Sequence, residues 1–327
     1  MASVEKIDEV DARILKDLLC DGRQQFIQIA RRAKVSEDVV WQHYANLKKK
    51  GVIVGSTIQI NYGSLGYGGA ASFFVNVPPQ YERDVAQQMR KIPGIYDVYR
   101  WGSHSCLWAV SDFMKTDQVD KVKLLIKKVS SVLKLEVEIW TDIRNMPENL
   151  SMFDKLHDVS RERMAKEAKF ARAKPGNIDN IDLQLIGKLK ANGRATFNKI
   201  GKELGISTST VIRRYNALRS DGVIRALIQV DPMKIGYLSE TCFRLTINSE
   251  ADLANLSDAI CKIPDITALI KTIGAYDLTT FAQVKSLEHF FALEAEVANV
   301  PGIREINPVA LNQFPVFPYP GEHMSTF

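Results

Sequence analysis

Hydrophobic and polar positions around residue 200 alternate with a helical period. The pattern predicts helices over residues 178–192 and 196–205, and a third that begins after Ser207, a residue suited to cap a helix N-terminus. In the third helix the core-facing positions are Val211, Tyr215 and Leu218. A Gly-Val-Ile run then opens an extended stretch, which we expect to form a short hairpin. Three helices and a hairpin describe a winged helix-turn-helix.

Beyond residue 234 the pattern changes to alternating strands and helices. Strands are predicted over 240–248, 266–273, 275–284 and 302–311, with helices over 250–263 and 286–300. This βαββαβ order is that of a ferredoxin-like domain, and residues 69–141 follow the same order. A sheet with helices on one face leaves an apolar face that requires a partner.

The two halves of the chain repeat each other at an offset of about 171 residues. Matching positions include Asp11 with Asp182, Gly22-Arg23 with Gly193-Arg194, Tyr44 with Tyr215, and Gly51-Val52-Ile53 with Gly222-Val223-Ile224. A duplicated unit of roughly 145 residues is the simplest explanation. We therefore expect an α+β fold of two tandem units, each a winged helix-turn-helix followed by a ferredoxin-like βαββαβ domain.

Domain boundaries follow from the repeat. The first copy comprises a winged helix-turn-helix (residues 1–62) and a ferredoxin-like domain (63–143), and the second comprises the same two parts (178–233 and 234–327, the latter with a C-terminal tail). Residues 144–177 form a charged linker, predicted to be a solvent-facing helix followed by a hinge at Pro175-Gly176. At 327 residues the chain is long enough for two to four domains of ordinary size.

Composition excludes several classes of protein. The 327 residues carry a formal net charge of +5, which permits an anionic partner without requiring one. The four cysteines are scattered, with no CxxC, so we expect reduced thiols in a cytoplasmic protein, no metal site and no cofactor. No apolar run approaches the roughly 18 residues of a membrane span. Nucleophile–base triads, Walker motifs and HExxH are also missing from the sequence.

The third helix of the second copy offers side chains suited to DNA. In a winged helix-turn-helix its N-terminal end enters the major groove, where arginine pairs with guanine and asparagine with adenine. Candidate base-reading residues are Thr208, Ser209, Arg213 and Asn216. Candidate phosphate-contacting residues are Lys202, Arg214, Arg219 and Arg225. A solvated surface on an ordinary three-helix domain is the competing interpretation.

The order of domains, together with "GRATFNKIGKELGISTSTVIRRYNALRSDGVIRALIQVDPMKIGY" and "TIGAYDL", resembles the leucine-responsive regulator/AsnC (Lrp/AsnC) family of transcription factors. The resemblance covers nearly the whole chain and implies double-stranded DNA as a partner. It also implies face-to-face pairing of ferredoxin-like domains, association into homo-oligomers, and a small effector, often an amino acid, near a Gly-x-x-Asp turn. That turn corresponds here to Gly274, Ala275, Tyr276 and Asp277.

The first copy departs from the family pattern in its third helix. Glu37 and Asp38 occupy the first turn, where carboxylates suit the helix dipole but repel phosphates. Trp41 replaces Ile212, and Gln42-His43 replaces Arg213-Arg214. Two interpretations stand side by side: a weak or altered DNA reader used for protein contacts, or an ordinary reader with another base preference.

The effector turn of the first copy is also altered. Gly102 matches Gly274, but Ser103-His104-Ser105 replaces Ala275-Tyr276-Asp277. His104 is either a core or interface histidine or part of a modified ligand pocket, so Gly102 and His104 complete the set of candidate effector residues.

Two other functions compete with a sequence-specific regulator. "YRWGSHSCLW", with Tyr99-Arg100 and His104, is similar to a pattern in siroheme decarboxylases, which share this two-part fold, although the spacing differs. A bound tetrapyrrole would reveal such an enzyme by its colour. The other alternative is an architectural DNA-binding protein, which would show steep salt dependence and little sequence preference.

Overall fold

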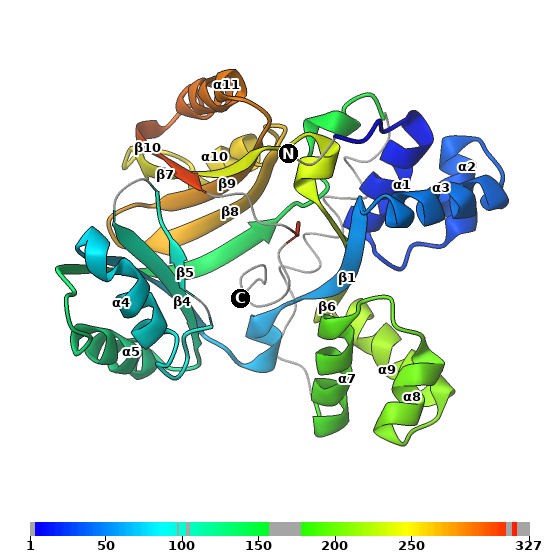
Figure 1. Cartoon of the computed structure of the whole chain (residues 1–327), viewed down its shortest axis with the longest axis horizontal. Coiled ribbons are helices and arrows are strands. Elements are labelled where there is room, and N and C mark those ends of the chain that lie inside the picture. Colours follow the sequence, from blue (N-terminus) through cyan, green and yellow to red (C-terminus); the bar gives the residue numbers. More distant parts are fainter. Residues whose placement is uncertain (1–3, 97, 103–104, 157–177, 312–315, 319–327) are drawn as a thin grey trace. The chain divides into compact units, whose positions relative to one another are not determined.

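The computed structural model describes residues 4–96, 98–102, 105–156, 178–311 and 316–318 (Figure 1). The chain divides into two compact units that each combine matching parts of both copies. One unit contains residues 1–65, 145–238 and 313–326, and therefore both winged helices. The other contains residues 66–144, 239–312 and 327, and therefore both ferredoxin-like domains. The predicted linker helix and hinge fall at 157–177, outside the described residues.

Each winged-helix domain has the three helices that the periodicity predicts. In the first copy these are α1 (Glu9–Cys20), α2 (Phe26–Ala33) and α3 (Glu37–Lys49). In the second copy they are α7 (Asn180–Ala191), α8 (Phe197–Leu204) and α9 (Thr208–Ser220). Ser207 caps α9 as expected, accepting a hydrogen bond from the Thr210 amide at 3.1 Å. Val211, Tyr215 and Leu218 are at most 5% exposed, so the predicted core face is confirmed.

The prediction of a hairpin within each winged helix is wrong, because among the described residues neither copy pairs two strands of its own there. Each copy supplies one strand, β1 (Ile53–Ile60) or β6 (Ile224–Val230), and these two strands pair with each other antiparallel (Figure 1). Ile60 lies opposite Ile224 and Ser56 opposite Ile228. The extended pattern after Gly-Val-Ile was therefore assigned correctly, but its partner lies in the other copy. A hydrophobic pattern specifies that a strand forms without specifying which strand completes the ladder.

The ferredoxin-like domains share one eight-stranded sheet. The first copy contributes β2 (Gly69–Asn76), α4 (Glu82–Met89), β3 (Val98–Arg100), β4 (Cys106–Phe113), α5 (Asp117–Lys127) and β5 (Lys134–Asn145). The second contributes β7 (Ser239–Ile247), α10 (Leu253–Ile260), β8 (Ile266–Ile273), β9 (Leu278–Val284), α11 (Leu287–Ala298) and β10 (Ile303–Leu311). The strand order is β10-β7-β9-β8-β5-β2-β4-β3, so β8 and β5 join the copies. Single 3-10 turns occur at Tyr62–Leu65, Pro79–Tyr81, Ser151–Phe153 and Pro232–Ile235.

The sheet faces that lack helices bury aromatic residues between the copies. Trp101 and Trp108 of the first copy lie 6.4 and 6.2 Å, centroid to centroid, from Phe281 of the second. Cys242 and Ile270 are buried in the same cluster at 0% and 2% exposure. The face-to-face pairing that the family resemblance implies therefore occurs here between the two copies of one chain. No helix among the described residues combines the length and apolar character needed to cross a membrane.

Candidate nucleic-acid interface

The outward side of α8 and α9 carries polar side chains that the fold leaves available. Lys202, Ser209, Arg213 and Asn216 are all exposed, and Thr208 is half-buried. The first turn of α9 has no acidic residue, and Arg213 has no hydrogen-bond or ion-pair partner among the residues described. This arrangement can present a guanidinium and an amide to base edges, with a lysine beside them for phosphate.

Arg214 is placed differently from its neighbour Arg213. One of its terminal nitrogens lies 2.8 Å from both Asp182 Oδ1 and Asp179 Oδ2, the two carboxylates that cap the start of α7. Hydrogen bonds to these carboxylates raise the pKa of Arg214 further. A phosphate contact would have to compete with both aspartates, so the structure gives Arg214 a role in fastening α9 to α7.

Arg219 and Arg225 also make contacts within the protein. Arg219 forms an ion pair with Asp21 of the first copy. Arg225 Nε donates to Gln59 Oε1 at 2.8 Å, and its Nη2 donates to the carbonyl of Asn145 at 2.9 Å. Of the eight residues predicted to bind DNA, these two and Arg214 are committed to intramolecular partners.

A reciprocal pair of arginines, which the sequence analysis missed, joins the two winged helices. Arg23 donates to the carbonyls of Gly193 (2.8 Å) and Ala195 (2.6 Å), and its guanidinium lies 4.2 Å from the ring centre of Phe197. Arg194 returns the contact by donating to the carbonyl of Gly22. Burial lowers the pKa of Arg23. The sequence does carry this Gly-Arg pair in both copies, as Gly22-Arg23 and Gly193-Arg194, but nothing in either pair shows that it contacts the other.

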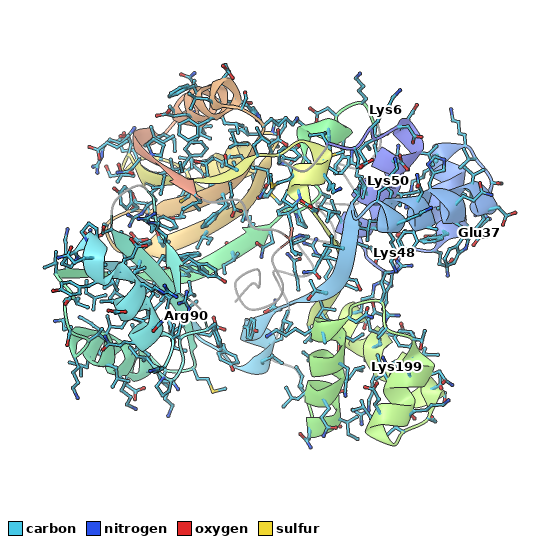
Figure 2. The ribbon with its side chains drawn as sticks, in the orientation of Figure 1. Lys6, Glu37, Lys48, Lys50, Arg90 and Lys199 are labelled. Atoms are coloured by element: carbon cyan, nitrogen blue, oxygen red, sulfur yellow. The ribbon has the colours of Figure 1, made fainter. Side chains whose placement is uncertain are left out.

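The corresponding helix of the first copy presents a different surface. Glu37 projects from the first turn of α3, which also contains Asp38 (Figure 2). Lys48 lies in the last turn of the helix and Lys50 at its C-cap (Figure 2). Trp41 is 53% exposed, and its ring contacts Phe26 with centroids 4.5 Å apart. The helix therefore offers carboxylates where α9 offers the hydroxyls of Thr208 and Ser209. Its Trp41 stands at the position of Ile212, and Gln42 stands at that of Arg213.

The predicted effector turn lies against the first copy. A Cβ on Gly274 would come within 2.7 Å of Glu138 Cγ, so glycine permits this approach. Tyr276 stacks on the Arg244 guanidinium at 4.1 Å, and Arg244 forms an ion pair with the buried carboxylate of Glu138. Burial, outweighing the nearby arginine, raises the pKa of Glu138. Ala275 is exposed, Gly102 is half-buried in a left-handed conformation (φ 66°), and His104 lies outside the described residues.

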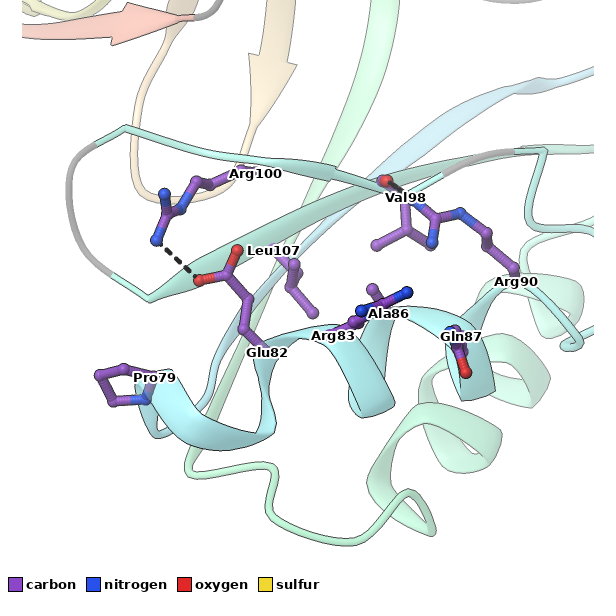
Figure 3. Close-up of a pocket in the computed structure, with 9 residues that line it drawn as sticks. All are labelled: Pro79, Glu82, Arg83, Ala86, Gln87, Arg90, Val98, Arg100 and Leu107. Carbon is purple, nitrogen blue, oxygen red and sulfur yellow. Dashed lines mark hydrogen bonds and ion pairs between the residues drawn. The ribbon is translucent and has the colours of Figure 1, made fainter.

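Among the residues that the structure describes, two cavities open on the ferredoxin-like domains. One, of about 900 Å³, is lined by Asp277, Glu250 and Arg304 together with residues 247–249, Ala251 and Gly302. The other, of about 490 Å³, lies between α4 and β3 of the first copy (Figure 3). There Arg100 pairs with Glu82 at 2.9 Å, and Arg90 donates to the Val98 carbonyl at 2.6 Å (Figure 3). Only the first cavity includes a residue of the predicted effector turn.

Comparison with known proteins identifies both winged helices. Residues 178–219 match the AsnC-type helix-turn-helix domain, and residues 7–54 match a winged helix-turn-helix DNA-binding domain. The HTH-type transcriptional regulator LrpA of Pyrococcus horikoshii is 31% identical over 130 residues, which is 39% of this chain and 92% of LrpA. HTH-type transcriptional regulator Ptr1 of Methanocaldococcus jannaschii is 30% identical over 132 residues, or 39% of this chain and 88% of Ptr1.

Among solved structures, the crystal structure of the siroheme decarboxylase NirDL aligns over 94% of this chain and 91% of that chain, with a TM-score of 0.56 and 15% identity. At this identity the similarity shows the fold alone. The regulators, in contrast, match at higher identity and nearly in full, each over roughly the length of one copy. The chain belongs to the Lrp/AsnC family of HTH-type transcriptional regulators and carries two family units in tandem.

Proposed function

We propose that the chain is a DNA-binding transcriptional regulator that reads bases with α9 of its second copy. The observation that carries the proposal is the outward face of α9, where Ser209, Arg213 and Asn216 are exposed within an AsnC-type helix-turn-helix. Arginine and asparagine at such positions make bidentate contacts to guanine and adenine. Arg213, rather than its neighbour Arg214, is the principal candidate because Arg214 is held by two aspartates.

The test measures DNA affinity of paired variants. Arg213→Ala should cost about 1–3 kcal/mol on a preferred site and relax the preference at one base pair. Lys202→Ala should weaken binding to all sequences similarly and reduce the salt dependence. The matched control is Gln42→Ala, the equivalent position on α3. Equal affinities for all three variants and the wild type would refute α9 as the reader.

We further propose that the cavity beside Asp277 receives a small zwitterionic effector such as an amino acid. Asp277 and Glu250 supply carboxylates for an ammonium group, and Arg304 supplies a guanidinium for a carboxylate. Asp277 is held in place because its Oδ2 accepts the amide of Ile247 at 2.9 Å. Titration with a panel of amino acids should show binding that Arg304→Gln removes. Binding that survives this change would place the effector elsewhere.

The competing enzymatic function rests on the shared fold with a siroheme decarboxylase. A direct test is addition of siroheme to the purified protein while recording the visible spectrum. A regulator should leave the spectrum of the free tetrapyrrole unchanged, whereas a saturable spectral shift would support the enzyme.

Self-association, which the family resemblance implies, is tested by light scattering on the purified protein. A mass of one chain would contradict it.

A further inference from the structure

Two carboxylates and an imidazole converge at the start of α1 in the first copy. Asp8 and Asp11 form a capping box in which Asp8 Oδ1 accepts the Asp11 amide at 2.8 Å and Asp11 Oδ2 accepts the Asp8 amide at 3.4 Å. The other oxygen of each carboxylate faces α3. His43 Nδ1 forms a hydrogen bond with Asp11 Oδ1 at 2.8 Å and lies 3.7 Å from Asp8 Oδ2, so a metal ion bound here would replace the proton of that hydrogen bond.

In the second copy an arginine, Arg214, occupies the position of His43. Asp179, Asp182 and Arg214 correspond to Asp8, Asp11 and His43 at the repeat offset of 171. There the same two carboxylate oxygens each lie 2.8 Å from one guanidinium nitrogen. The fold therefore holds a positive charge between these carboxylates in the second copy. The first copy keeps both aspartates but has His43 in place of the arginine, and histidine is a side chain that can ligate metal ions.

We propose that Asp8 Oδ2, Asp11 Oδ1 and His43 Nδ1 bind a divalent first-row transition metal ion, with Zn²⁺ the best match to one nitrogen and two oxygen ligands. Metal–ligand bonds of about 2.1 Å place neighbouring ligand atoms about 3.0 Å apart in octahedral geometry and about 3.4 Å apart in tetrahedral geometry. The two observed distances from Nδ1, 2.8 and 3.7 Å, bracket these values, and all three ligand atoms lie within 4.8 Å of one another.

The surroundings suit a bound ion that keeps water ligands. The Asp11 side chain is 8% exposed, His43 28% and Asp8 54%, so one side of the cluster is fixed and the other is open. Backbone amides already hold both carboxylates in orientation, as partners outside the first coordination sphere do in metal sites. A metal ion here would fasten α3 to α1, as Arg214 fastens α9 to α7.

The test uses metal-free full-length protein titrated with Zn²⁺ by calorimetry and with Co²⁺ by visible absorption. The wild type should bind one more equivalent of metal than His43→Arg, a variant that reproduces the arrangement of the second copy and should therefore fold. Zn²⁺ should raise the thermal unfolding temperature of the wild type but not that of His43→Arg. His289→Gln, which changes a histidine beside Asp265 instead, should bind like the wild type.

The proposal is overturned if His43→Arg binds as many equivalents as the wild type, or if neither protein binds Zn²⁺. The site is independent of DNA recognition, so Arg213→Ala should retain full metal binding even while it loses affinity for DNA.

Discussion

Substitution of Gly193 by alanine should disrupt the contact between the two winged helices. An added Cβ would lie 2.1 Å from the carbonyl oxygen of Thr57 and 2.7 Å from its carbonyl carbon, both backbone atoms of β1. Ordinary contacts of this kind are longer than 3 Å, so the turn after α7 must move away from β1 by about 1 Å. The equivalent close approach occurs in the other copy, where a Cβ on Gly22 would lie 2.6 Å from the backbone of Leu227.

The size of the effect follows from the contacts that such a movement breaks. The Gly193 amide donates to the Ser56 carbonyl at 3.0 Å, and its carbonyl accepts from Arg23 Nε at 2.8 Å. Overpacking costs about 1–3 kcal/mol, and each lost hydrogen bond adds about 0.5–1.5 kcal/mol. With both hydrogen bonds lost, we therefore expect a loss of about 2–6 kcal/mol in the free energy of unfolding of the winged-helix unit. A loss of 3 kcal/mol lowers the unfolding temperature by about 6–12 °C for a unit of this size.

The assay is denaturant and thermal unfolding followed by circular dichroism, with Gly187→Ala as the matched control. Gly187 lies within α7, and its added Cβ would meet no atom within 4 Å. Alanine there should stabilise the helix by about 0.5–1 kcal/mol. Overpacking of Gly193 against β1 is ruled out if Gly193→Ala is as stable as the wild type, or if Gly187→Ala is the more destabilised of the two.

Three further changes test other parts of the structure. Arg214→Ala should lower the unfolding temperature whereas Arg213→Ala should not, because only Arg214 bonds to the capping aspartates of α7; equal temperatures would contradict this. Burial raises the pKa of Glu240 to about 8, so the folded state binds a proton more tightly than the unfolded state does. The free energy of unfolding should therefore fall as the pH rises from about 5 to 8. Denaturant titrations at several pH values should show a flatter slope for Glu240→Gln. Gly274→Ala should destabilise the ferredoxin-like unit by about 1–3 kcal/mol in the same titrations, because its Cβ would overlap Glu138. Unchanged stability would show that the turn can move away.

Much of the fold could be predicted because its signals are local. The cap at Ser207 and the core face formed by Val211, Tyr215 and Leu218 depend on residues within one helix. The repeat also carried information, because two copies of an open-faced sheet in one chain indicate that the faces meet. The contact between Trp108 of the first copy and Phe281 of the second, with ring centroids 6.2 Å apart, agrees with this prediction.

The remaining features depend on residues far apart in the sequence. The pairing of β1 with β6 could not be read from either strand, because each has the same pattern whether its partner is its own hairpin or the other copy. Arg213 and Arg214 are adjacent and chemically identical, yet only the second reaches the aspartates at the start of α7. The cluster of Asp8, Asp11 and His43 has no compact sequence motif for the same reason.

Base reading by α9 is tested most directly by selection of DNA from a random pool with the purified protein and with Arg213→Ala in parallel. If α9 reads bases, the wild type should enrich a defined motif, and the variant should lose the preference at one or more of its positions while keeping the fold. A motif with a single strong half-site would further show that α3, with Glu37 and Asp38 in its first turn, no longer reads bases. Failure to enrich any motif, or enrichment of the same motif by both proteins, would contradict the account.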